Sequence, residues 1–175
     1  AAETKPEAVT VYRHATLIDG TGGPARADMA VVVKGERIVS VSPDAALKAA
    51  DLAGARTVDL KATYLLPGLI DSHEHLATPP NRKQAEGTLR RDLYGGVTAV
   101  RDMADDLRAV AELARASRAA EIPGPDIYYA ALMAGPSFFV DPRTRAANFG
   151  VTPGQAPWMQ SIDRGTDIRQ AGTLA

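Results

Sequence analysis

The chain has 175 residues, of which 45% are hydrophobic and 23% charged, the composition of an ordinary globular protein that can bury a core. Its 20 lysines and arginines nearly balance its 21 acidic residues, which argues against nucleic acid or an anionic membrane as a partner. The lack of cysteine excludes disulfides and thiolate metal sites.

The N-terminal residues leave the cellular location open. The chain starts with Ala1, and Ala-Ala-Glu-Thr-Lys-Pro is compatible both with the product of signal-peptide cleavage and with an arbitrary boundary. Export to the periplasm and a cytoplasmic location are therefore equally expected. No apolar run approaches the roughly 20 residues that span a bilayer, so we expect no membrane segment.

The first third of the chain has the character of a β-rich region. Several runs favour strands, and two of them flank Lys34-Gly35-Glu36 in the manner of a hairpin. These runs are residues 9–12, 15–18, 29–33, 37–41 and 57–60. His14 lies among them, and we expect it to be a half-exposed strand residue rather than a metal ligand.

A short apolar run from Tyr64 leads into two histidines separated by one residue. If this stretch is a β-strand, His73 and His75 point to the same face, because side chains at i and i+2 do so. Two imidazoles on one face provide half of a tetrahedral site for zinc or a similar divalent metal. The same alternation places Asp71 beside them as a hydrogen-bond partner for the ligands and turns Glu74 the other way.

The rest of the chain alternates helices and strands. We expect helices over residues 82–94 and 106–120 and strands over residues 97–103 and 127–133. A β-α-β-α-β order of this kind calls for parallel strands joined by right-handed crossovers.

Two further features are candidates for an active site. Arg101 and Asp102 lie at the carboxyl end of the second of these strands, where α/β barrels place active-site groups, although an internal ion pair or a helix N-cap explains them too. Residues 134–160 lack evident secondary structure, which is typical of a lid or substrate-binding loop. Three aromatic residues there either line a pocket or anchor the loop. They are Phe138, Phe139 and Trp158.

Two stretches resemble the amidohydrolase superfamily. Pro67-Gly68-Leu69-Ile70-Asp71-Ser72-His73-Glu74-His75 matches the Pro-Gly-hydrophobic-hydrophobic-Asp-x-His-x-His pattern of the first barrel strand in that family. Residues 95–103 are similar to the second-strand region of its imidazolonepropionase and prolidase-like members. With the strands that precede them, the resemblance extends over residues 9–133.

The resemblance implies an α/β fold in two parts. Residues 1–63 correspond to a small β-sandwich portion, and residues 64–175 to the first three units of a (β/α)8 TIM barrel. A closed barrel takes about 250 residues, so we expect the chain to be a truncated, N-terminal part of the enzyme. The family completes its metal site with a lysine, two histidines and an aspartate that acts as general base, all expected beyond Ala175.

The function implied is hydrolysis of an amide or other C–N bond by metal-activated water. His73 and His75 are the expected metal ligands, with Asp71 supporting them and Arg101 and Asp102 at the rim of the site. We also expect one or two divalent metal ions, with zinc as the first choice. The expected substrate is a small molecule or a dipeptide. The chain alone should be inactive and should associate with the remainder of the barrel or with a second copy. The alternative is a non-catalytic binding or assembly module that retains the histidine pair as a relic.

Overall fold

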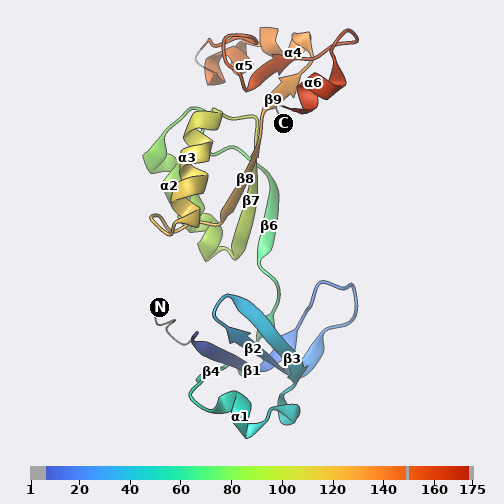
Figure 1. The fold of residues 1–175 in the computed structure, drawn as a ribbon, viewed down its shortest axis with the longest axis vertical. Helices are drawn as coiled ribbons and strands as arrows, with labels where there is room; N and C mark the ends of the chain where they lie inside the picture. Colours follow the sequence, from blue (N-terminus) through green and yellow to red (C-terminus); the bar gives the residue numbers. More distant parts are fainter. Residues whose placement is uncertain (1–6, 149, 174–175) are drawn as a thin grey trace, which may run out of the picture. The chain divides into compact units, whose positions relative to one another are not determined.

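The structure is a computed structural model that describes residues 7–148 and 150–173. The chain divides into two compact units, Ala1–Pro67 and Gly68–Ala175 (Figure 1). The division falls after Pro67 and not after residue 63, where the sequence analysis placed it, because Tyr64 and Leu65 form a strand that pairs with the first unit. Within the described ranges, no helix combines the length and the apolar character that crossing a bilayer requires.

The first unit is a mixed sheet with the strand order β3-β2-β1-β4, in which β5 also pairs with β1. β2 runs antiparallel to β1 and β3, whereas β4 and β5 run parallel to β1. The strands are β1 (Val9–Leu17), β2 (Arg26–Lys34), β3 (Arg37–Pro43), β4 (Arg56–Asp59) and β5 (Tyr64–Leu65). A 3-10 turn, η1 (Asp44–Ala46), and a short helix, α1 (Ala49–Leu52), lie between β3 and β4.

The pairing of β1 with β2 is interrupted by register shifts. The two runs that favour strands at residues 9–12 and 15–18 form one strand, and the pairing shifts between Tyr12 and Ala15 and again before Leu17. His14 and Asp28 lie at these irregularities with φ of 53° and 51°, a left-handed conformation that few non-glycine residues adopt. Buried residues of both strands, such as the register partners Val11 and Val32, contribute to the core of the unit.

The second unit begins with a three-stranded parallel sheet of order β6-β7-β8. Its elements are β6 (Leu69–Glu74), α2 (Arg82–Tyr94), β7 (Val97–Met103), α3 (Leu107–Arg118) and β8 (Asp126–Ala130). Both helices cover one face of the sheet (Figure 1), where Leu89, Val100 and Ile127 are buried together. The other face exposes large apolar side chains, among them Ile70 at 73% and Tyr128 at 59%.

The ends of the two helices follow from local sequence chemistry. The Asn81 side chain accepts a hydrogen bond from the Gln84 amide and caps α2, and the Asp106 side chain caps α3 in the same way through Arg108. After α2, Gly96 adopts a φ of 85°, which a glycine supplies without strain.

The remainder of the second unit is more structured than its sequence indicates. It contains β9 (Leu132–Ala134), α4 (Pro136–Val140), α5 (Pro142–Ala147), β10 (Met159–Ser161) and α6 (Ile168–Gly172). The expected strand over residues 127–133 ends at Ala130, and β9 pairs in parallel with β10. The prediction of an unstructured segment over residues 134–160 is wrong, because a proline opens each of α4 and α5 and a small apolar cluster holds the segment together. The fold as a whole is mixed α/β.

Candidate metal centre

The two histidines at the end of β6 lie close together. The His73 and His75 ring centroids are 5.2 Å apart, and the ring planes are inclined by 73°. His73 is the penultimate residue of β6, and His75 follows its last residue. Residues two apart in an extended chain share a face, which brings both imidazoles to one side of the carboxyl end of the strand. This pair offers two neutral nitrogen ligands of the kind that zinc prefers.

A buried carboxylate holds one of the two rings. Asp105 Oδ1 lies 2.9 Å from His75 Nδ1, and Asp105 is only 1% exposed. The Ala77 amide donates to Asp105 Oδ2 at 2.5 Å, and the Thr78 hydroxyl also donates to this carboxylate. This contact occupies the Nδ1 side of the His75 ring, and among the described residues its Nε2 has no hydrogen-bond partner.

Asp102 lies beside this carboxylate and not at a solvent-exposed rim. It is fully buried, and its Oδ2 accepts a hydrogen bond of 2.8 Å from the Leu76 amide. Among the described residues its Oδ1 has no hydrogen-bond partner. Burial raises the pKa of Asp102 well above its usual range, and the negative charge of Asp105 raises it further.

Arg101 does not share the surroundings of Asp102. Neighbouring residues of a strand point to opposite faces, so Asp102 is buried under the helices while Arg101 is exposed. No ion pair joins the two in the described parts of the chain, and the cap of the following helix is Asp106. Among the residues that the structure describes, neither the internal ion pair nor the Asp102 cap that the sequence left open is present.

Asp71 makes a hydrogen bond to the backbone of β6 and not to an imidazole ring. Its Oδ1 accepts a hydrogen bond of 2.9 Å from the backbone N–H of His73, and over the described ranges it makes no hydrogen bond to either ring. The pairing of β6 with β7 shifts between Asp71 and Glu74, so the strict alternation from which its position was inferred does not hold there. Asp105, which the sequence analysis did not single out, makes the contact to a histidine ring instead.

Glu74 turns away from the histidines, toward α2. It lies beside Asp102 in the β6–β7 pairing. Burial raises the pKa of Glu74 to about 7, and the negative charges of Asp92 and Asp71 contribute in the same direction. Over the described residues, Glu74 makes no hydrogen bond to either imidazole ring, and its buried Oε2 has no partner.

A cavity of about 660 Å³ lies against His75 and Asp105. Its opposite wall comes from α4 and α5 and the residue after them, with Phe138, Arg143 and Asn148 among the lining side chains. Of the three aromatic residues in this segment, only Phe138 lines this cavity. Phe139 is buried in the apolar cluster around Met159, and the Arg108 guanidinium lies 4.7 Å from the centre of the Trp158 ring system. Phe138 thus fits the prediction of a pocket wall. Phe139 and Trp158 fit the alternative, in which aromatic residues anchor the segment.

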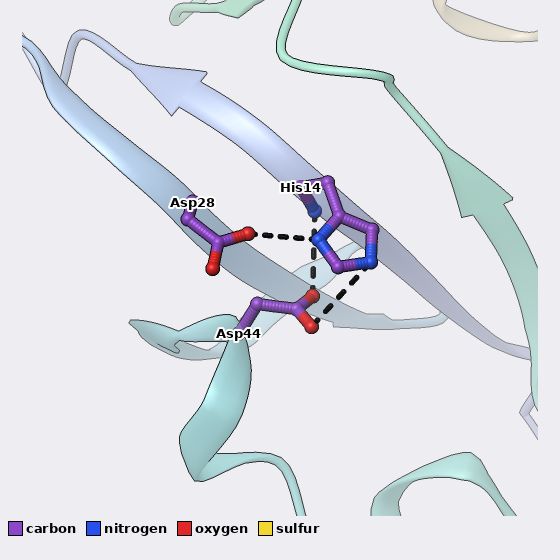
Figure 2. A group of neighbouring side chains, drawn as sticks. All are labelled: His14, Asp28 and Asp44. Atoms are coloured by element: carbon purple, nitrogen blue, oxygen red, sulfur yellow. Dashed lines mark hydrogen bonds and ion pairs between the residues drawn. The ribbon is translucent and has the colours of Figure 1, made fainter.

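A second group of metal-ligating side chains occurs in the first unit (Figure 2). His14 Nδ1 lies 2.7 Å from Asp28 Oδ1, and its Nε2 lies 3.7 Å from Asp44 Oδ2. One ligand atom from each residue falls within 4.8 Å of the others. Asp44 already binds the Arg13 guanidinium through both oxygens, at 3.0 and 2.5 Å. A cation here would meet a carboxylate that is already neutralised, so the ion-pair network accounts for the group without a metal.

The curated proteins whose sequences are similar to this chain are enzymes. An imidazolonepropionase from Anaeromyxobacter dehalogenans is 36% identical over 78 residues, which are 42% of this chain and 18% of that protein. An imidazolonepropionase from Arthrobacter is 34% identical over 133 residues, 71% of this chain and 31% of that protein. The chain thus spans about a fifth to a third of the length of these relatives. No family model matches the chain.

Solved structures match the fold over larger shares of the chain. A putative prolidase from Bifidobacterium longum, 26% identical, covers 75% of this chain and 32% of its own with a TM-score of 0.60. An amidohydrolase that is 22% identical covers 93% of this chain and 43% of its own with a TM-score of 0.69. The names of these proteins support a hydrolytic function in general and do not favour a non-catalytic module. The 22% identical amidohydrolase structure shows the likeness of fold. Together with the motif that carries His73 and His75, the curated relatives show that the chain belongs to the amidohydrolase superfamily.

Proposed function

We propose that this chain supplies the first metal ligands of a hydrolase that cleaves an amide or another C–N bond. The observation that carries the proposal is the convergence of His73 and His75, with His75 held by a buried carboxylate at the wall of a cavity. Histidines that ligate metals usually donate their other ring N–H to a carboxylate or a carbonyl, and the contact of the His75 ring with Asp105 has this arrangement.

The residues of the chain have distinct tasks in this reaction. His73 and His75 hold a divalent ion, zinc by preference, and Asp105 holds His75. When bound, such an ion supplies Lewis acidity toward a carbonyl oxygen and lowers the pKa of a water ligand. Two imidazoles are fewer than the three protein ligands of a usual catalytic zinc site. We infer that the missing ligands, a second ion where there is one, and an aspartate as general base come from the remainder of a barrel or from a partner copy.

The parallel sheet supports the finer fold assignment. We infer that β6, β7 and β8 with their helices are the first three units of a (β/α)8 barrel and that the first unit is part of a β-sandwich. Parallel pairing in sequence order and connections through single helices are what a barrel requires. His73, His75 and Asp105 all lie at the carboxyl ends of strands, which is where barrel enzymes place their sites.

The cavity limits the size of the substrate. Its volume of about 660 Å³ falls within the range of about 300–1,000 Å³ that is usual for small-molecule sites. We infer a small-molecule or dipeptide substrate, with a cyclic amide or a dipeptide ending in proline as the first candidates. These two substrate classes are supported by the names imidazolonepropionase and prolidase among the similar proteins.

Zinc titration of the purified chain tests the proposal. By isothermal calorimetry we expect weak zinc binding, because water must complete the shell, and loss of that binding in a His73→Ala, His75→Ala double variant. The chain has one other histidine, so His14→Ala is the matched control and should leave the affinity unchanged. Equal binding by the double variant would remove the pair from the site, and loss of binding in His14→Ala would move the site to the first unit. We expect no turnover of amide substrates by the chain alone.

A further inference from the structure

Among the described residues, Asp105 is the acidic side chain that contacts a ring of the histidine pair. It lies just after β7, two residues beyond Met103, in a bend that follows Ala104 at a φ of 72°. Its carboxylate is almost fully buried, yet it accepts hydrogen bonds from the Ala77 amide and the Thr78 hydroxyl. It also lies within hydrogen-bonding distance of the His75 ring. Three donors from one short segment converge on it, so a single carboxylate fixes that segment.

The neighbouring Asp102 completes the attachment. Its Oδ2 accepts the Leu76 amide at 2.8 Å, one residue before the amide that Asp105 accepts. The chain that leaves β6 is therefore bonded at consecutive amides to two buried carboxylates of the next strand region. A segment held in this way cannot rotate freely, and the orientation of the His75 ring follows from it.

The two histidines differ in this respect. His73 receives support only at its backbone N–H, from Asp71, and among the described residues its ring has no hydrogen-bond partner. The His75 ring faces a carboxylate that can only accept, which requires a proton on Nδ1 and selects Nε2 as the ligand atom. The pair thus consists of one ring that is fixed in advance and one that is free to adjust.

We propose that Asp105 is a positioning residue that fixes the tautomer and the orientation of His75 for metal binding. The part of this inference that concerns metal rests on the proposed function, whereas the tautomer of His75 does not. In the metal-free chain His75 is the Nδ1–H tautomer whenever its ring is neutral. The carboxylate also raises the basicity of the ring as a ligand, so zinc binding depends on Asp105 although Asp105 does not touch the ion.

The tautomer can be read directly by nitrogen NMR of the imidazole rings in the metal-free chain, at an alkaline pH where both rings are neutral. We expect a protonated Nδ1 and an unprotonated Nε2 for His75 in the unchanged protein. An Nε2–H tautomer for His75 would overturn the proposal without any variant, so the test does not depend on the folding of a mutant.

Zinc calorimetry then measures what the contact does. Asp105→Asn should weaken zinc binding by about 10–100-fold, the usual effect of removing such a partner. Asp106→Asn is the matched control, because it removes the neighbouring charge, keeps a residue that caps α3 and touches neither histidine. Unchanged affinity in Asp105→Asn, or an equal loss in Asp106→Asn, would overturn the positioning role. Failure of the unchanged chain to bind zinc would overturn the proposed function instead, and the tautomer would still report on Asp105.

Discussion

Gly68, the residue before β6, lies against the Thr98 side chain of β7. A Cβ at residue 68 would lie 2.0 Å from Thr98 Oγ1, 2.3 Å from its Cγ2 and 2.6 Å from its Cβ. Such distances are far below van der Waals contact, so the strand cannot take any side chain there without a shift. The glycine of the Pro-Gly pair therefore permits the close approach that sets the start of the histidine strand.

We expect Gly68→Ala to destabilise the chain by about 1–3 kcal/mol, the usual cost of overpacking. The measurement is the free energy of unfolding from urea denaturation followed by circular dichroism. Thr98→Ala in the same chain should restore part of the loss, because it removes two of the three clashing atoms. Gly87→Ala is the control, since its Cβ meets nothing within 4 Å inside α2, and it should stabilise the helix by about 0.5–1 kcal/mol. Additive effects of Gly68→Ala and Thr98→Ala would contradict the proposed clash.

His14 makes the stability of the first unit depend on pH. The hydrogen bond to Asp28 raises the pKa of His14, and Asp44 contributes in the same direction. Because the folded pKa is above the unfolded value of about 6.5, the stabilisation is fully present below that pH and is lost as pH rises through the folded pKa. Asp28→Asn should therefore lower the melting temperature at acidic pH and have less effect at alkaline pH. Glu36→Gln, which removes a charge from an exposed turn in the same unit, is the control, and a pH-independent effect of Asp28→Asn would refute the assignment.

At the scale of single residues, spacing alone predicted the histidine pair but not its surroundings. His73 and His75 meet because alternation along a strand is a local property. Asp71 was placed by the same rule, which failed where the β6–β7 register shifts, and a shift of this kind depends on the partner strand. Asp105 is 30 residues from His75, and only its place just past the end of a predicted strand could have pointed to it.

Within α2, burial distinguishes residues that look alike in the sequence. Leu89 is fully buried against the sheet, whereas Leu93, one turn later, is 37% exposed. We expect Leu89→Ala to cost about 2–5 kcal/mol of unfolding free energy, from lost burial and the cavity left behind. Leu93→Ala in the same helix should cost clearly less. Equal losses in urea denaturation would mean that α2 does not pack on the sheet through Leu89.

The elements divide into those that local chemistry specifies and those that it does not. α2 and α3 follow from apolar spacing, a capping side chain at the start and, for α2, glycines at the end. The segment after β8 was expected to lack structure because its helices have five and six residues and its strands three. Elements of this length carry too few residues to show a period. Their order comes from the cluster of Leu132, Phe139 and Met159, which sequence inspection cannot assemble.

On the scale of the whole chain, one face of the parallel sheet remains uncovered. Ile70 and Tyr128 are more than half exposed there. Exposed apolar side chains on a sheet favour association, so we expect the chain to self-associate in size-exclusion chromatography with light scattering. Ile70→Lys should weaken association about tenfold or more, because burial of one isoleucine side chain is worth about 1.5–3 kcal/mol. Ile168→Lys changes the same residue type in α6, where it is 84% exposed, and serves as the control. A monomer that melts cooperatively would refute this prediction.

The parts of the site come from distant parts of the sequence. The histidines belong to β6, and the facing wall of the cavity belongs to α4 and α5, more than sixty residues later. The ligand strand is constrained by its neighbours, at Gly68 by Thr98 and at His75 by Asp105, whereas the helices of the wall are short and carry mostly exposed side chains. Substitutions in α4 and α5 can therefore reshape the cavity while the two histidines stay in place. Under the proposed function, such changes would alter which substrate fits and leave the ligand pair intact.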